Sequence, residues 1–119
     1  MIARVPLDEG SLSGTLTLDS RWPDGDWRTT YFGPAALAAT IPRVEALRPL
    51  VPEGQTMAQL ALRFILSNPD VTTVIPGTRT LEHLAANVAA AEAGPLPADV
   101  MDALRDHRWD RPQSRASLS

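Results

Sequence analysis

The sequence predicts an α/β fold in which two parallel strands are joined through about four helices. A short apolar run at residues 1–5, which stops at Pro6, is one expected strand, and five β-branched residues at 71–75 are the other. The second run suits a parallel strand covered on both faces. Apolar residues recur at helical spacing over four further stretches, at about residues 34–49, 56–68, 81–91 and 98–107. Because helices separate the two strands, we expect a parallel, right-handed crossover.

Two of the expected helices carry local signals. Pro34 suits the first position of a helix, whereas Pro42 lies inside the same pattern and predicts a kink or two short helices, since an interior proline costs about 3 kcal/mol. Thr56 and Gln59 form a capping-box pair ahead of the next helix. That helix is apolar nearly all round, so we expect other elements to sandwich it.

A sheet of two strands is too small to stand alone, because both strands would be edges and the apolar helix would keep one face uncovered. The missing surface must come from elsewhere. Between the first strand and the first helix, residues 6–32 are expected to form an ordered loop, because free loops rarely carry two tryptophans such as Trp22 and Trp27.

Charge and composition exclude several kinds of function. With 11 Lys+Arg against 14 Asp+Glu and a net charge of −3, the chain has no basic face for nucleic acid. It holds no cysteine for a disulfide, a metal site or a nucleophile, and His83 and His107 lack metal-binding spacing, so no metal ligand is assigned. Its apolar runs fall far short of the roughly 20 residues that span a bilayer. We expect a soluble, cytoplasmic protein with neither nucleic-acid nor membrane partners.

The turn at residues 76–80, PGTRT, is the first candidate binding site. A strand that feeds a helix through a glycine turn gathers unpaired N–H groups and the positive end of a helix dipole at one place. Arg79 can donate two hydrogen bonds to a phosphate and keeps its charge at any working pH. Spacing alone favours the alternative, a plain turn with a solvated arginine. Taken alone, His83 and Asn87 are also typical of surface residues.

The segment after the first strand is the second candidate. Residues 6–14 contain Gly10 and Gly14, so their amides could cradle a pyrophosphate. Their spacing fits neither a Walker loop nor the G-x-G-x-x-G pattern. Asp8 and Glu9 within the segment favour a solvated acidic turn instead.

Taken in order, four stretches resemble the carboxyl-terminal portion of the aldo-keto reductases: VPLDEGSLSG, ALRFILSNP, VTTVIPGTR and LEHLAAN. The resemblance runs from about Ile2 to Trp109 with the correct order and spacing. Since the family fold is an eight-stranded barrel, it implies a partial (β/α)8 TIM barrel built from the last two β/α units and the final helix. Residues 1–109 would form this segment, and residues 110–119 a disordered tail.

The resemblance also implies a cofactor. The family binds NADP(H) across the carboxyl ends of the strands, and a charged arginine there favours NADPH over NADH. The positions that match the family's contacts are Leu7, Gly10 and Leu12 for the loop over the pyrophosphate, Gly77, Thr78 and Arg79 for the 2′-phosphate of the adenosine, and Asn87 for the adenine.

Some positions depart from the family pattern. Arg4 stands where many members have an aromatic residue that stacks on the nicotinamide, and its flat guanidinium could stack instead. Val5 replaces a common serine, which removes one hydroxyl contact to the cofactor. His83 and Ala86 stand where a glutamine and an acidic residue line the adenine pocket. His83 remains a candidate contact.

The family's Asp, Tyr, Lys and His tetrad belongs to the first half of the barrel. This chain has one tyrosine, Tyr31, and no lysine, so we assign it no catalytic residue. We interpret it as an NADP(H)-binding fragment of an enzyme that reduces aldehydes or ketones, or as a gene product that begins at an internal methionine, and expect it to be inactive alone. The alternatives are a stand-alone nucleotide-binding module and a non-enzymatic piece. Such a piece would pair with the missing N-terminal barrel half or self-associate through its exposed strands.

Overall fold

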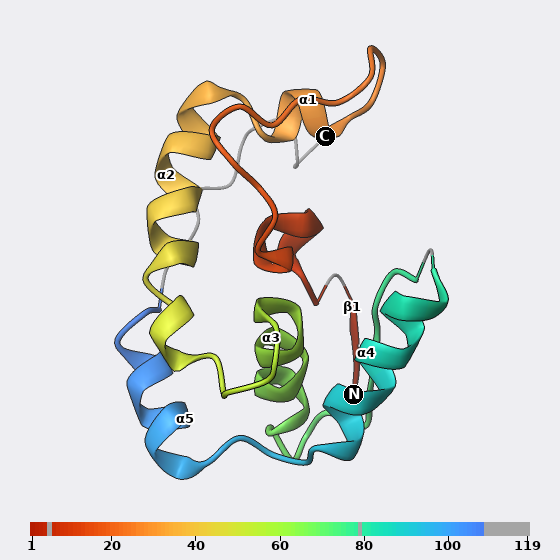
Figure 1. Ribbon diagram of the computed structural model, residues 1–119, viewed down its shortest axis with the longest axis vertical. Helices are drawn as coiled ribbons and strands as arrows, with labels where there is room; N and C mark the ends of the chain where they lie inside the picture. Colours follow the sequence, from red (N-terminus) through yellow and green to blue (C-terminus); the bar gives the residue numbers. More distant parts are fainter. Residues whose placement is uncertain (5, 79, 109–119) are drawn as a thin grey trace.

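The computed structural model describes residues 1–4, 6–78 and 80–108, and Val5, Arg79 and residues 109–119 lie outside this part. The predicted α/β fold is confirmed, with two strands and five α-helices among the described residues (Figure 1). In chain order the elements are β1 (Ile2–Arg4), the 3-10 helix η1 (Asp8–Ser13), α1 (Arg28–Tyr31), α2 (Pro34–Glu45), the 3-10 helix η2 (Arg48–Leu50), α3 (Met57–Leu66), β2 (Thr73–Ile75), α4 (Leu81–Glu92) and α5 (Ala98–Arg105).

The two strands form a parallel pair, as the crossover through helices predicts. Their register aligns Ile2 with Thr73, Ala3 with Val74 and Arg4 with Ile75. The middle pair is half-buried and the outer pairs are exposed. Because alternate residues of a strand point to opposite faces, the outer pairs share one face. The expectation that residues 71–75 are covered on both faces is therefore wrong for β2, whose β-branched side chains find packing partners on one face.

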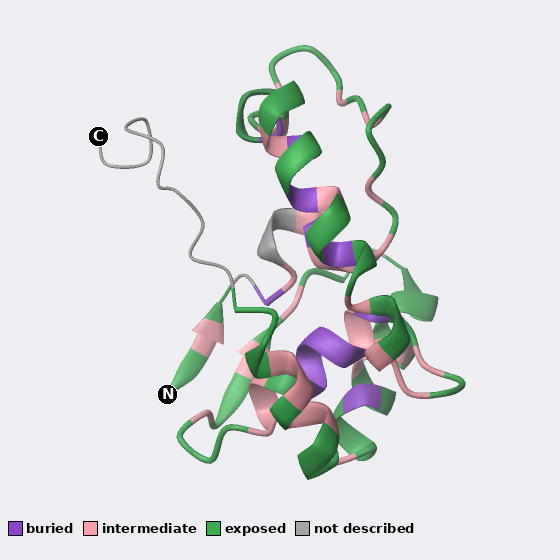
Figure 2. Cartoon of the chain, turned by 90° about the vertical axis from the view of Figure 1, so that its left-hand side faces the viewer, coloured by how far each residue is buried: buried purple, intermediate pink, exposed green. Residues whose placement is uncertain are grey.

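The buried core lies among the helices and loops. It gathers Val44 of α2, Met57 and Leu60 of α3, and Leu96 before α5, with Leu12 of η1 packed against this cluster. In Figure 2 the buried segments lie in helices and loops, while both strands carry only exposed and intermediate colours. Apolar burial among the described residues is therefore concentrated in the helices and loops.

Helix α3 begins with the predicted capping box. The Thr56 hydroxyl accepts a hydrogen bond from the Gln59 N–H at 3.1 Å, and Gln59 Oε1 accepts one from the Thr56 N–H at 2.9 Å. The Gln59 Nε2 atom also donates to the Ala86 carbonyl of α4 at 3.0 Å. One side chain thus closes the start of α3 and joins it to α4. The sandwiching of α3 is incomplete, since Phe64 is 46% exposed.

Arg63 is a buried charge that sequence reasoning does not single out. Its guanidinium donates to the carbonyls of Gly94 and Pro95, each at 2.9 Å, and to Gln55 Oε1 at 3.0 Å. These bonds connect α3 to the turn between α4 and α5 and to the loop before α3. Burial of a charge is tolerable when it is well hydrogen-bonded, and here each of the three guanidinium nitrogens donates to an acceptor.

Two local features differ from the sequence expectation. The two short helices offered as one alternative at Pro42 are wrong, because α2 is a single helix that contains Pro42, and Pro42 and Ala38 one turn earlier are both exposed. The ordered loop gains η1 and α1, and Trp22 stacks on the buried Phe32 with ring centroids 5.4 Å apart.

No helix in the described part of the chain is long and apolar enough to cross a membrane.

Candidate functional site

The carboxyl ends of the two strands lie side by side and bring the two candidate loops together. Arg4 and Ile75, the last residues of β1 and β2, are partners in the register. Neighbouring strands are about 4.8 Å apart, so the segments that leave them start from nearly the same point. Figure 1 shows η1 and the N-terminal end of α4 at this same end of the sheet.

The segment after β1 is held rigidly by its own backbone. The Leu7 carbonyl accepts hydrogen bonds from the N–H groups of Gly10 at 3.0 Å and Leu12 at 3.1 Å. Gly10 has φ +105°, a conformation that side-chain-bearing residues rarely adopt. Two of the amides that the sequence offered to a pyrophosphate are therefore already bonded internally. The Leu12 side chain packs against the core cluster.

The turn after β2 is tied to α4 by two side chains. Thr80 caps α4, and its hydroxyl accepts a hydrogen bond from the His83 N–H at 3.0 Å. Asn87 Nδ2 donates to the Thr78 hydroxyl at 3.3 Å. Two residues that the resemblance assigns to different parts of one nucleotide thus contact each other. Arg79, the expected phosphate ligand, lies outside the described residues.

The remaining predicted positions are exposed around this end of the sheet. Gly77 is exposed and an added Cβ there would meet no atom within 4 Å. Arg4 is exposed on the open face of the sheet, and the His83 side chain is exposed on α4. Val5 lies outside the described residues, so the lost hydroxyl contact stays a prediction.

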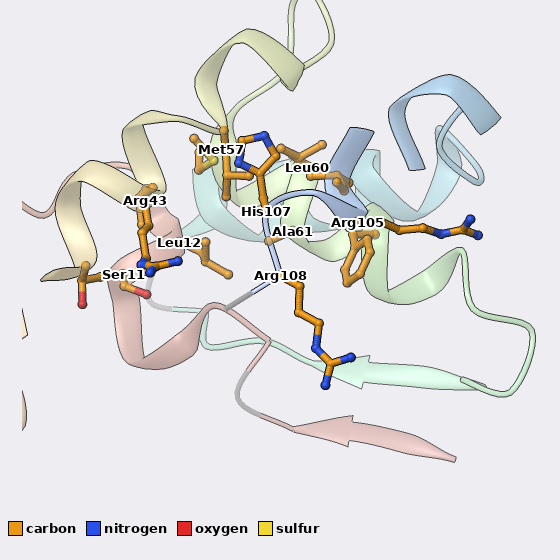
Figure 3. Close-up of a pocket in the computed structure, with 14 residues that line it drawn as sticks. Ser11, Leu12, Arg43, Met57, Leu60, Ala61, Arg105, His107 and Arg108 are labelled. Carbon is orange, nitrogen blue, oxygen red and sulfur yellow. The ribbon is translucent and has the colours of Figure 1, made fainter. Parts of the chain in front are cut away.

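A cavity of about 780 Å³, which the sequence did not predict, lies beneath η1 and among α2, α3 and the end of α5 (Figure 3). The surface of its lining is mostly apolar and includes the Leu12 side chain. Figure 3 shows Arg43 pointing toward Ser11 and Leu12, whereas the guanidinium groups of Arg105 and Arg108 point away. The cavity therefore offers apolar contact and no convergent charged site. The helical spacing of Val44, on α2, and Leu47, just after it, was the available signal.

Charge pairs with shifted pKa values lie outside this end of the sheet. A side-chain hydrogen bond from Arg48 lowers the pKa of Glu45, and the bond between Asp26 and Arg28 raises the pKa of the guanidinium. The described residues contain no group of three His, Cys, Asp or Glu side chains that could hold a metal ion.

The sequence model of the aldo/keto reductase family matches residues 1–108. This chain belongs to the aldo/keto reductase family. Uncharacterized oxidoreductases from Mycobacterium tuberculosis and Mycobacterium bovis are 36% identical to it over 107 residues, which is 89% of this chain and 32% of the relative. The chain spans about a third of the length of these curated relatives.

Solved structures of an aldo-keto reductase from Bacillus halodurans, in holo and apo forms, have the same fold. Each superposes with a TM-score of 0.61 at 24% identity, covering 96% of this chain and 35% and 36% of the holo and apo chains. The fold is thus similar to the barrel of this family.

Proposed function

We propose that the chain is the carboxyl-terminal, NADP(H)-binding portion of an aldo/keto reductase that reduces aldehydes or ketones. The observation that carries this proposal is the parallel register, which brings the ends of β1 and β2 together so that η1 and the turn before α4 flank one place. Carboxyl ends of parallel strands are where barrel enzymes place their sites.

The open surface above both turns supports the fit of a dinucleotide. A Cβ added at Gly10 or at Gly77 would meet nothing within 4 Å, so a ligand can approach the backbone at both glycines. The turn at Gly77 and Thr78 leads directly into α4, and the first N–H groups of a helix attract phosphate oxygens. The proposed roles are therefore pyrophosphate cover for the first loop and phosphate binding for the second.

Arg79 would hold the 2′-phosphate and Asn87 the adenine edge, with Leu7 near the pyrophosphate and Leu12 anchoring the loop to the core. The N–H groups of Gly10 and Leu12 already donate to the Leu7 carbonyl. Gly10 and Leu12 therefore position the loop, and their N–H groups do not donate to the ligand. Arg4, at the end of β1, is the candidate for the nicotinamide ring. When bound, the cofactor supplies a hydride to the carbonyl carbon.

Protonation of the carbonyl oxygen requires an acid that this chain does not supply, since the sequence contains no lysine and a single tyrosine. The proposal therefore assigns binding and orientation of the cofactor to this chain. It assigns proton transfer to residues outside it.

The test is to measure binding of NADPH and NADH to the 119-residue chain by calorimetry, for wild type and for Arg79→Ala. We expect wild type to prefer NADPH, and Arg79→Ala to weaken NADPH binding about tenfold or more while changing NADH binding little, since a charge-assisted bond to the extra phosphate is lost. Arg21→Ala is the matched control, because the Arg21 guanidinium donates to the carbonyl of its neighbour Ser20. Equal loss for both cofactors would contradict the assignment.

A further inference from the structure

We infer that the open face of the β1–β2 sheet is a docking surface for the remaining strands of an aldo/keto reductase barrel, supplied by a portion that this chain does not span. The inference rests on family membership and on the geometry of the sheet. It is independent of cofactor binding, so either proposal can fail alone.

One face of the sheet packs against helices, and the other is open to solvent. Ala3 and Val74 are half-buried toward the helices, and α3 packs against β2. On the other face Ile2 and Ile75 are each 59% exposed. Parallel sheets occur almost only with both faces covered, and two strands alone are too few for a stable sheet. The open face is therefore a surface that we expect another part of a barrel to cover.

A second apolar surface on α4 supports the same conclusion. Leu81, Leu84 and Val88 recur at helical spacing and are all exposed, with Leu81 at 83%. The opposite side of α4 is covered, because Ala90 is buried and the Ala86 carbonyl accepts the bond from Gln59. The stripe predicted from the sequence is thus real but faces away from α3. An exposed apolar stripe of this kind marks a contact with another element.

The share of its relatives' length that the chain covers indicates which partner would cover the open face of the sheet. The chain covers 32% of the curated relatives and 35% of the solved holo neighbour. Each strand has one neighbour among the described residues, so both edges of the pair are open as well as the face. A barrel of this class closes with eight strands. A second copy of this chain would add two strands of three residues, whereas the remaining barrel portion covers the face and both edges together.

The experiment co-expresses the tagged 119-residue chain with the part of the Mycobacterium tuberculosis relative that lies outside the matched region. Size-exclusion chromatography with light scattering then gives the mass of the purified material. We expect a one-to-one complex. Amide hydrogen exchange should show that β1 and β2 become protected in the complex.

Ile75→Asp places a charge on the open face and should weaken the complex about tenfold or more, because desolvation of a carboxylate is costly even with Arg4 opposite it in the register. Ile75→Ala should weaken it less, which separates lost contact from buried charge. Leu18→Asp is the matched control, since Leu18 is also 59% exposed but lies in the loop before α1. Circular dichroism of each variant alone confirms folding.

Three results would overturn the inference. One is a homodimer of this chain that forms in preference to the one-to-one complex. Another is the absence of any complex at the highest soluble concentration. The third is an equal loss of complex in Ile75→Asp and Leu18→Asp.

Discussion

The side of α3 that meets α4 and the open face of the sheet are opposites in how fully their groups are satisfied. On the α3 side, Gln59 donates to the Ala86 carbonyl, and Arg63 donates to three acceptors in the neighbouring loops. On the sheet side, Ile2 and Ile75 are each 59% exposed. The first region thus holds polar side chains whose acceptors lie within the chain, and the second presents apolar side chains to solvent.

This difference separates contacts that stabilise the isolated chain from surfaces that would be buried only by a partner. A region with complete hydrogen bonding should lose stability when one partner is removed, because a buried group left without a partner keeps its full desolvation cost. An exposed apolar face should tolerate substitution in the isolated chain and respond only when a partner is present. The following predictions test that division, from the largest effect to the smallest.

Arg63→Leu should destabilise the chain by about 3 kcal/mol, because it removes three hydrogen bonds from a buried guanidinium and leaves two carbonyls unbonded. Denaturant unfolding followed by circular dichroism measures this. The matched control is Arg105→Leu, whose partner Asp102 is 3.2 Å away in an exposed pair, and whose cost should stay below about 0.5 kcal/mol. Similar costs for the two variants would remove the distinction between the two regions.

Gly14→Ala and Gly10→Ala separate backbone strain from packing. Both glycines have positive φ, +81° and +105°, so either substitution should cost about 1 kcal/mol through strain. At Gly14 the added Cβ would also lie 3.1 Å from Met57 Cβ in the core, whereas at Gly10 it meets nothing within 4 Å. We expect Gly14→Ala to cost about 2 kcal/mol in total. Equal unfolding midpoints for the two variants would show that Met57 moves without cost.

The smallest effect concerns acid. Arg48 lowers the pKa of Glu45 below its ordinary value of 4.5, and the same arginine donates to the Gly14 carbonyl at 2.9 Å. A carboxylate with a lowered pKa stabilises the fold above its unfolded pKa, and this contribution is lost as the pH falls through the folded pKa. Thermal unfolding at neutral pH should therefore show wild type slightly more stable than Glu45→Gln. The gap should close by about pH 3, and a gap that widens in acid would reverse the assignment.

Local signals predicted the elements of the fold well. The parallel strand pair follows from two apolar runs separated by helices, and the capping box follows from Thr56 and Gln59 three positions apart. These features depend on neighbouring residues, so the sequence contains them directly. The coverage of each face of the sheet does not depend on neighbouring residues alone, so local sequence signals do not predict it. The β-branched run through Ile75 would suit either environment, and the choice depends on which other elements pack against it.

The candidate site was predictable in its position and less so in its details. The strand register places both loops at one end of the sheet, as the order of elements implies. The use of the Gly10 and Leu12 amides within the loop was not visible, because it depends on how the chain folds back on Leu7. Arg63 was hidden for a similar reason: two of its acceptors lie 31 and 32 residues away.

The double role of Gln59 has a consequence for the order of folding. Its Oε1 atom completes the first turn of α3, while its Nε2 atom is held by a carbonyl in the middle of α4. When the α4 carbonyl is lost, the Gln59 side chain is free to rotate, which weakens its bond to the Thr56 N–H. Fraying of α4 should therefore loosen the start of α3, and the two helices should melt as one cooperative unit even in a chain whose sheet is left open.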